Sequence, residues 1–138
     1  MKTVQEIFGD SASAEKLAKA LNKSASEQYA DAFRAELNAA SCVDFPKLRM
    51  FVSDSFLCIY NFGALKFDVQ LISIAEMANI YRSNMWNGEY DFKNWYLVSE
   101  NAEGQRRFLA SELRRGTKNM NVFDEVIACL RSKKAKMA

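Results

Sequence analysis

The stretch from Lys47 to Ala110 most constrains what this chain can fold into, because it is a nearly continuous series of strand-like segments. Apolar and polar residues alternate in several of these segments, which is typical of strands with one buried face. The connections between segments are only a few residues long, and short connections favour antiparallel pairing. We therefore predict one antiparallel sheet or barrel of six to seven short strands in meander order.

Turn-forming residues divide this stretch into its strands. Ser53-Asp54-Ser55 and Asn61-Phe62-Gly63 are the first two turn signals, and Ser73–Glu76 indicates a helical turn or a bend. We place a seventh strand either within Phe62–Ile72 or within residues 85–95. The six strands that we expect first are Leu48–Val52, Phe56–Tyr60, Leu65–Ile72, Met77–Arg82, Trp95–Ser99 and Arg106–Ala110.

Helical patterns flank the strand region on both sides. Capping-box spacings begin at Thr3 and at Ser24, and Ser13 is a good N-cap, so we expect two to three helices before about Ala40. After the strands, Asn121 is an N-cap for an amphipathic helix that runs to about Arg131. Its apolar stripe consists of Phe123, Val126, Ile127 and Leu130.

The predicted domain organisation is one structural unit. Residues 1–44 form a helical segment packed on the domain, and residues 45–138 form the antiparallel barrel with its C-terminal helix. A chain of 138 residues, 49% of them hydrophobic, is long enough to bury an ordinary core. The overall expectation is an α+β fold.

Composition also restricts location and chemistry. The longest apolar stretches are too short to cross a bilayer and the N-terminus lacks a secretion-signal pattern, so we expect a cytoplasmic protein without membrane insertion. Cys42, Cys58 and Cys129 are widely spaced, which favours free thiols over a disulfide framework or a metal site. The chain contains no histidine, which excludes Ser-His and Cys-His catalysis and histidine-based zinc sites. We expect no cofactor and no metal.

Basic residues are concentrated near the C-terminus. Residues 102–138 carry nine basic and four acidic side chains, whereas the net charge of the whole chain is only +2. That net charge does not indicate a specific nucleic-acid partner. An anion-attracting face is one interpretation, and a solvated edge with a frayed basic tail is the other. The anion-binding candidates are Arg106, Arg107, Arg114, Arg115 and Lys118.

The segment Met85–Trp95 is unusually aromatic for a connection between strands. Gly88 and the asparagines in the segment make it conformationally permissive. Either its rings fold back to close one end of the sheet, or they form an exposed patch for a protein partner or for self-association. The partner-binding candidates are Trp86, Tyr90, Phe92 and Trp95.

The order of elements over about residues 45–134 resembles a bacterial pleckstrin-homology-like domain. The resemblance is carried by the hairpins Leu48–Tyr60 and Trp95–Ala110, the segment Leu71–Tyr81 and the helix Val122–Leu130. It implies a small bent antiparallel barrel closed by one C-terminal amphipathic helix. Phosphoinositide-binding members carry several basic residues around the first hairpin. Here that turn is Ser53-Asp54-Ser55, so phosphoinositide binding is not expected.

Two classes of function follow from these observations. The first is a non-catalytic cytoplasmic interaction module with an unknown partner. The alternative is a small-molecule pocket protein or enzyme with a ketosteroid-isomerase-like α+β cone that uses carboxylate and tyrosine chemistry. Its candidate residues are Asp68, Glu76, Tyr60, Tyr81 and Tyr96.

Overall fold

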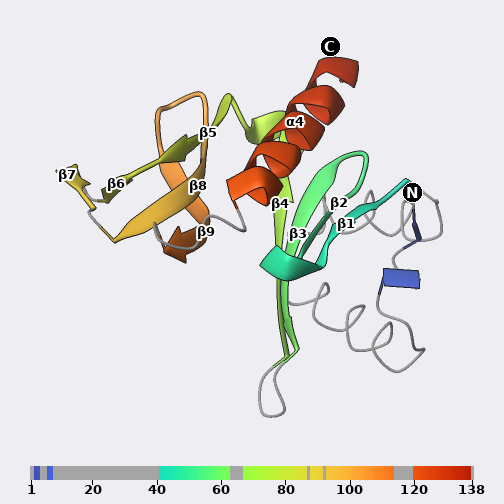
Figure 1. Cartoon of the computed structure of the whole chain (residues 1–138). Helices are drawn as coiled ribbons and strands as arrows, with labels where there is room; N and C mark the ends of the chain where they lie inside the picture. Colours follow the sequence, from blue (N-terminus) through green and yellow to red (C-terminus); the bar gives the residue numbers. More distant parts are fainter. Residues whose placement is uncertain are drawn as a thin grey trace. The chain divides into compact units, whose positions relative to one another are not determined.

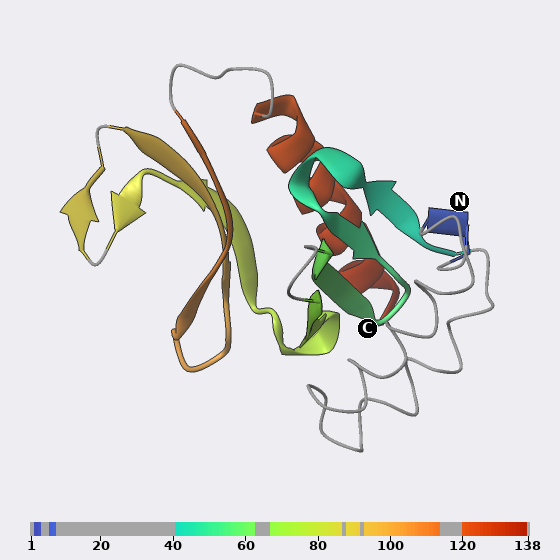
Figure 2. The same ribbon diagram turned by 90° about the horizontal axis from the view of Figure 1, so that it is seen from below.

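A computed structural model describes residues 2–3, 6–7, 41–62, 67–86, 88–91, 93–113 and 120–137. The chain divides into two compact units, Met1–Ile74 and Ala75–Ala138, which Figures 1 and 2 colour by sequence. The α+β class with antiparallel sheets and a C-terminal helix is confirmed. The helices expected between residues 8 and 40 lie outside the described residues, and the division at residues 44 and 45 stays a prediction.

The first unit contains a four-stranded antiparallel sheet in the order β1-β2-β3-β4. A short 3-10 helix, η1 (Pro46–Leu48), joins the first two strands, and Arg49 then turns the chain with a φ of 54°. Proline suits the first turn of such a helix because its missing N–H would have no partner there. The strands are β1 (Val43–Phe45), β2 (Met50–Val52), β3 (Phe56–Phe62) and β4 (Phe67–Ser73).

Ser53 closes the turn between β2 and β3. Its amide donates to the Phe56 carbonyl at 2.8 Å, and its fully buried hydroxyl accepts a hydrogen bond from the Phe56 amide at 3.0 Å. The same hydroxyl lies 3.2 Å from the Phe56 carbonyl and donates to it. Asp54 and Ser55 are left at the tip, so the turn predicted at Ser53-Asp54-Ser55 is confirmed.

The centre of this sheet is buried. Met50, Phe51 and Val52 are each 0% exposed, so both faces of β2 are covered. Phe51 pairs with Cys58 on β3, whose thiol is free. Burial raises the pKa of the Cys58 thiol above its ordinary value, which keeps the thiol protonated and unreactive.

Two contacts of the described N-terminal residues lie within this unit. Lys2 and Cys42 exchange two backbone hydrogen bonds of 2.8 and 2.9 Å in an antiparallel bridge. Thr3 Oγ1 accepts a hydrogen bond of 3.1 Å from the Glu6 amide. That bond is the N-cap to N3 half of the predicted capping box.

The second unit contains a three-stranded antiparallel sheet, a two-stranded ribbon and one helix. The helix α4 (Met120–Lys136) lies alongside the edge strand β5. Phe123, Val126, Ile127 and Leu130 are all buried, which confirms the predicted apolar stripe. The sheet has the order β5-β8-β9, with β5 (Asn79–Ser83), β8 (Asn94–Glu100) and β9 (Arg106–Leu113); the ribbon consists of β6 (Met85–Trp86) and β7 (Glu89–Tyr90).

The prediction of one sheet or closed barrel over residues 47–110 was wrong. The chain leaves the first ladder after Ser73 through the 3-10 helix η2 (Ile74–Glu76), and β5 then pairs with β8 and not with β4. The extra strand β1 lies at Val43–Phe45, where we expected the helical part to close. Asn61 and Phe62 continue β3 and pair with β4, so they are not a turn.

Candidate functional site

The segment Met85–Trp95, here called the aromatic ribbon, begins as a paired hairpin and not as an open loop. Met85 pairs with Tyr90 and Trp86 with Glu89. Gly88 lies in the connecting turn with a φ of 81°, a conformation that residues with a Cβ rarely adopt. In Figures 1 and 2 this hairpin extends beyond the end of the sheet formed by β5 and β8.

The two sides of the hairpin differ in length where it meets the sheet. Between the pair Ser83–Tyr96 and the pair Met85–Tyr90, one side has only Asn84, whereas the other has residues 91–95. The Asp91 amide donates to the Asn84 carbonyl at 2.7 Å and resumes the pairing. Extra residues on one strand bend a ladder, so the ribbon leaves the sheet at a bend.

Asp91 anchors the longer side of this bend. Its Oδ1 accepts hydrogen bonds from the Lys93 amide at 2.8 Å and the Asn94 amide at 3.1 Å, and its Oδ2 accepts one from the Tyr96 hydroxyl. The Tyr96 hydroxyl is the main cause that lowers the pKa of Asp91 to about 2, with the Lys93 amide next. The same bond raises the pKa of Tyr96. Asp91 is therefore an ionised anchor at neutral pH and a poor general base.

The predicted partner-binding aromatics lie in different environments. Tyr90 is 41% exposed, and in the described part of the chain only Met137 is a comparably exposed large hydrophobic residue. Trp95 is half-buried in β8, and the Arg82 guanidinium lies 5.7 Å from the centre of its ring. The structure describes the backbone of Trp86 in β6 and not its side chain, and Phe92 lies outside the described residues.

Two of the five predicted anion-binding residues can be placed. Arg106 and Arg107 are exposed in β9, where they pair with Glu100 and Ser99. Consecutive residues of a strand point to opposite faces of a sheet, so these two guanidinium groups do not converge. The remaining candidates, Arg114, Arg115 and Lys118, lie outside the described residues.

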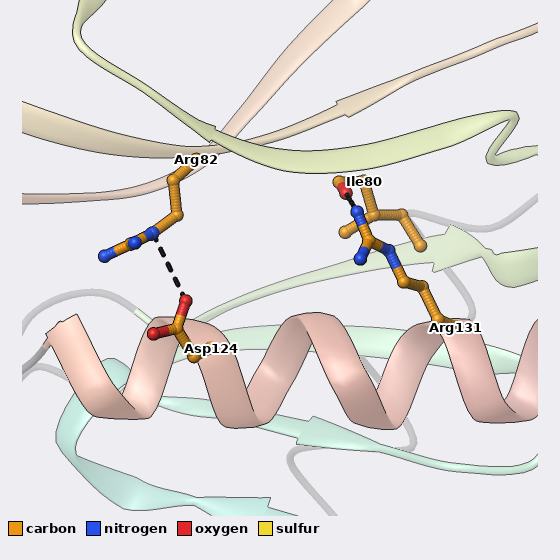
Figure 3. A network of polar contacts seen from close by, with 4 residues as sticks. All are labelled: Ile80, Arg82, Asp124 and Arg131. Atoms are coloured by element: carbon orange, nitrogen blue, oxygen red, sulfur yellow. Dashed lines mark hydrogen bonds and ion pairs between the residues drawn. The ribbon is translucent and has the colours of Figure 1, made fainter.

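The basic residues of α4 do not belong to a frayed tail, because the helix continues to Lys136. Arg131 Nη2 donates to the Ile80 carbonyl at 2.8 Å, and Lys134 Nζ donates to the Ala75 carbonyl at 2.6 Å. Figure 3 shows Arg131 reaching from α4 to Ile80 and Arg82 reaching toward Asp124. The Arg82 Nε lies 3.2 Å from Asp124 Oδ1. The i, i+3 spacing of Arg131 and Lys134 places both cations on one helix face but does not indicate which carbonyls they meet.

A groove lies between β5 and the C-terminal half of α4, and we call it the edge groove. Its volume is about 370 Å³, and Tyr81 and Ala135 lie among its lining residues. A second groove of about 400 Å³ adjoins it; this groove shares Ala78 and Lys134 and includes Glu76 and Glu103. The other residues that line the edge groove are Met77, Ala78, Asn79, Ile80, Arg131 and Lys134.

The residues expected to support carboxylate and tyrosine chemistry have the following surroundings in the structure. The Tyr81 hydroxyl donates to Glu100 at 2.9 Å, while Tyr96 donates to Asp91. Burial is the main cause that raises the pKa of Tyr60 to about 12. Glu76 lines the second groove, and Asp68 pairs with Asn61 in the other unit. The pKa values of Tyr60, Tyr81 and Tyr96 are all raised, which makes these side chains weaker proton donors near pH 7.

Asp44 is a residue that the sequence analysis did not single out. Burial raises the pKa of its carboxyl group, opposed by the charge of Lys2. Its Oδ1 is buried and has no hydrogen-bond partner within the described part of the chain. A carboxylate placed on a three-residue strand beside Pro46 gives no sequence signal of burial, so only the structure reveals it.

Comparisons with protein-family models, with curated proteins and with solved structures each found no match. Within the described residues, no group of three or more His, Cys, Asp and Glu side chains is arranged to hold a metal ion. None of the described helices has both the length and the apolar character needed to cross a membrane. The interpretation of the site therefore depends on the geometry of the aromatic ribbon and of the edge groove.

Proposed function

We propose that this protein is a non-catalytic interaction module of the cytoplasm that binds a protein partner through the aromatic ribbon. The observation that carries the proposal is the 41% exposure of Tyr90 on a hairpin fixed at its base by Asp91. An exposed tyrosine on a rigid support offers a large contact area at little entropic cost. Binding to such a support does not first require a loop to become ordered.

The proposed fold relationship is to the pleckstrin-homology-like domains. The order of a four-stranded meander, a three-stranded meander and a C-terminal helix supports this relationship. The exposed Asp54 at the tip of the first hairpin favours a protein ligand over an anionic lipid headgroup. The hydrogen bonds of Tyr81 and Tyr96 to carboxylates weigh against the alternative of an enzyme that uses these phenols.

The experiment replaces two of the ribbon aromatics together, as Trp86→Ala with Tyr90→Ala. Light scattering coupled to size-exclusion chromatography measures assembly, and capture on the immobilised protein measures partner binding. We expect the double variant to lose self-association or capture while its melting temperature stays nearly unchanged, because the exposed Tyr90 side chain contributes little to the core.

The matched control is Met137→Ala, which truncates another exposed large hydrophobic side chain, at the end of α4. This variant should keep the assembly and capture of the unmodified protein. A double ribbon variant that loses several kcal/mol of stability, in the manner of a core truncation, while assembling normally would show that the protein covers its own ribbon. That result would refute the proposal.

A further inference from the structure

The edge groove has features of a binding site that is separate from the aromatic ribbon. Met77 and Ile80 supply buried apolar side chains to its lining, and Ala78 and Ala135 leave space because their side chains are small. Its volume of about 370 Å³ falls within the usual range of small-molecule sites. An apolar lining with a few polar groups is the usual composition of such sites.

Two cations line the edge groove, and each bonds to a backbone carbonyl. Arg131 and Lys134 each donate one hydrogen bond to a backbone carbonyl, of Ile80 and of Ala75. A guanidinium group carries five N–H donors and an ammonium group three, so both side chains keep further donors. Because the carbonyls already hold them in place, a ligand loses less free energy in ordering them.

Nearby carboxylates restrict where a ligand's charge can lie. None of the described residues that line the edge groove is acidic. Glu76 and Glu103 line the adjoining groove, which shares Lys134, so they weaken the attraction of an anion to that end. Glu100, which accepts the Tyr81 hydroxyl, lies opposite Arg106 on β9. The favourable position for a negative charge is therefore the Arg131 end of the edge groove.

We propose that the edge groove binds a small organic carboxylate with a short apolar chain. The carboxylate accepts hydrogen bonds from Arg131, with Lys134 adding its charge, and the chain lies against Met77 and Ile80. A planar guanidinium matches a carboxylate in shape, and a single negative charge suits two cations whose field is partly offset by Glu76 and Glu103. This site is independent of the protein-binding role of the aromatic ribbon.

The test is an NMR titration of the ¹⁵N-labelled full chain with sodium hexanoate at constant ionic strength. Hexanamide is the matched neutral probe, and inorganic phosphate is a charged probe without an apolar chain. We expect hexanoate to shift the amide signals of residues 78–81 and 131–135 in a saturable way. Hexanamide and phosphate should each bind at least about tenfold more weakly, because each lacks one of the two interactions.

Variants separate the role of the two cations. Lys134→Gln and Arg131→Lys should each weaken hexanoate binding at least about fivefold, whereas Lys47→Gln, at an exposed position of η1, should leave it unchanged. A thermal melt of each variant checks that α4 still packs. If the Arg131 variant unfolds, the effect of Lys134→Gln on hexanoate binding decides whether the cations bind the carboxylate. The double ribbon variant should bind hexanoate normally, so failure of one proposal is distinguishable from failure of the other.

Unchanged hexanoate binding by Lys134→Gln would overturn the proposal, and so would any of three titration results. The first is the absence of saturable shifts at residues 78–81 and 131–135 with hexanoate. The second is equal binding of hexanamide, which would remove the role of the cations. The third is equal binding of phosphate, which would remove the role of Met77 and Ile80.

Discussion

Replacement of Phe123 by alanine tests whether the buried stripe of α4 stabilises the fold. Phe123 is 0% exposed and is one of the largest fully buried side chains of the described residues. Removing a buried phenylalanine ring costs about 3 to 5 kcal/mol, from lost burial and the cavity that remains. Domains of this size have free energies of unfolding of about 5 to 15 kcal/mol. The loss is therefore a large part of the total.

Urea denaturation followed by circular dichroism measures this loss. With a denaturant slope of about 1 to 3 kcal/mol per molar, a loss of about 4 kcal/mol moves the midpoint by roughly 1.3 to 4 M. The control is Glu125→Ala, an exposed position of the same helix, which should change the free energy of unfolding by less than about 0.5 kcal/mol. A loss below about 1 kcal/mol for Phe123→Ala, with an unchanged slope, would refute the argument that this stripe is core.

Two further predictions concern the hairpins. The pKa of Asp91 is lowered from 3.8 to about 2, so its anchoring contribution is complete above about pH 4 and is lost as the pH falls through about 2. The NMR signal of the Lys93 amide should therefore titrate with a midpoint near pH 2. Asp91→Asn should remove that titration and return the pKa of Tyr96 toward its ordinary value. A midpoint near pH 4 for the unmodified protein would contradict the role of Asp91 as an anchor. Ser53→Ala should lower the free energy of unfolding by about 1 to 3 kcal/mol, because the buried Phe56 amide loses its hydroxyl acceptor; a neutral effect in urea denaturation would show that this bond contributes nothing.

The local structure of the strands could be predicted from the sequence, because turn chemistry and alternation act over a few residues. The turn at Ser53 and the stripe of α4 are both confirmed. Pairing within the predicted hairpins followed from their short turns, since β2 pairs with β3 and β8 pairs with β9. Pairing after β4 could not be predicted, because it depends on which edges meet once the chain leaves that strand. The interruption at Ser73–Glu76 was recognised, but nothing in it indicates that β5 takes β8 as its partner.

The candidate site was also predictable only in part, because some of its features depend on local sequence and others on contacts between distant residues. The aromatic content of Met85–Trp95 was evident, whereas its paired ribbon depends on Gly88 and on the hydrogen bonds of Asp91. Asp91 bonds residues only two to five positions away, yet many aspartates in polar connections make no such bonds. The C-terminal cations were interpreted as an anion-attracting face or as a solvated edge with a frayed tail, since sequence alone cannot show that Arg131 meets a carbonyl 51 residues away.

The contact of Arg131 also indicates where an extended partner strand would bind. β5 is an edge strand of its sheet, and unpaired edges invite another strand to add. On β5 the Ile80 carbonyl already accepts a hydrogen bond from Arg131, and α4 lies alongside the strand. A partner strand at that position would have to displace a charged hydrogen bond, which is among the stronger kinds. The ribbon strands β6 and β7 form a two-stranded sheet, so both are edge strands among the described elements. An extended protein partner is therefore expected at the ribbon, and the edge groove is left to a small ligand.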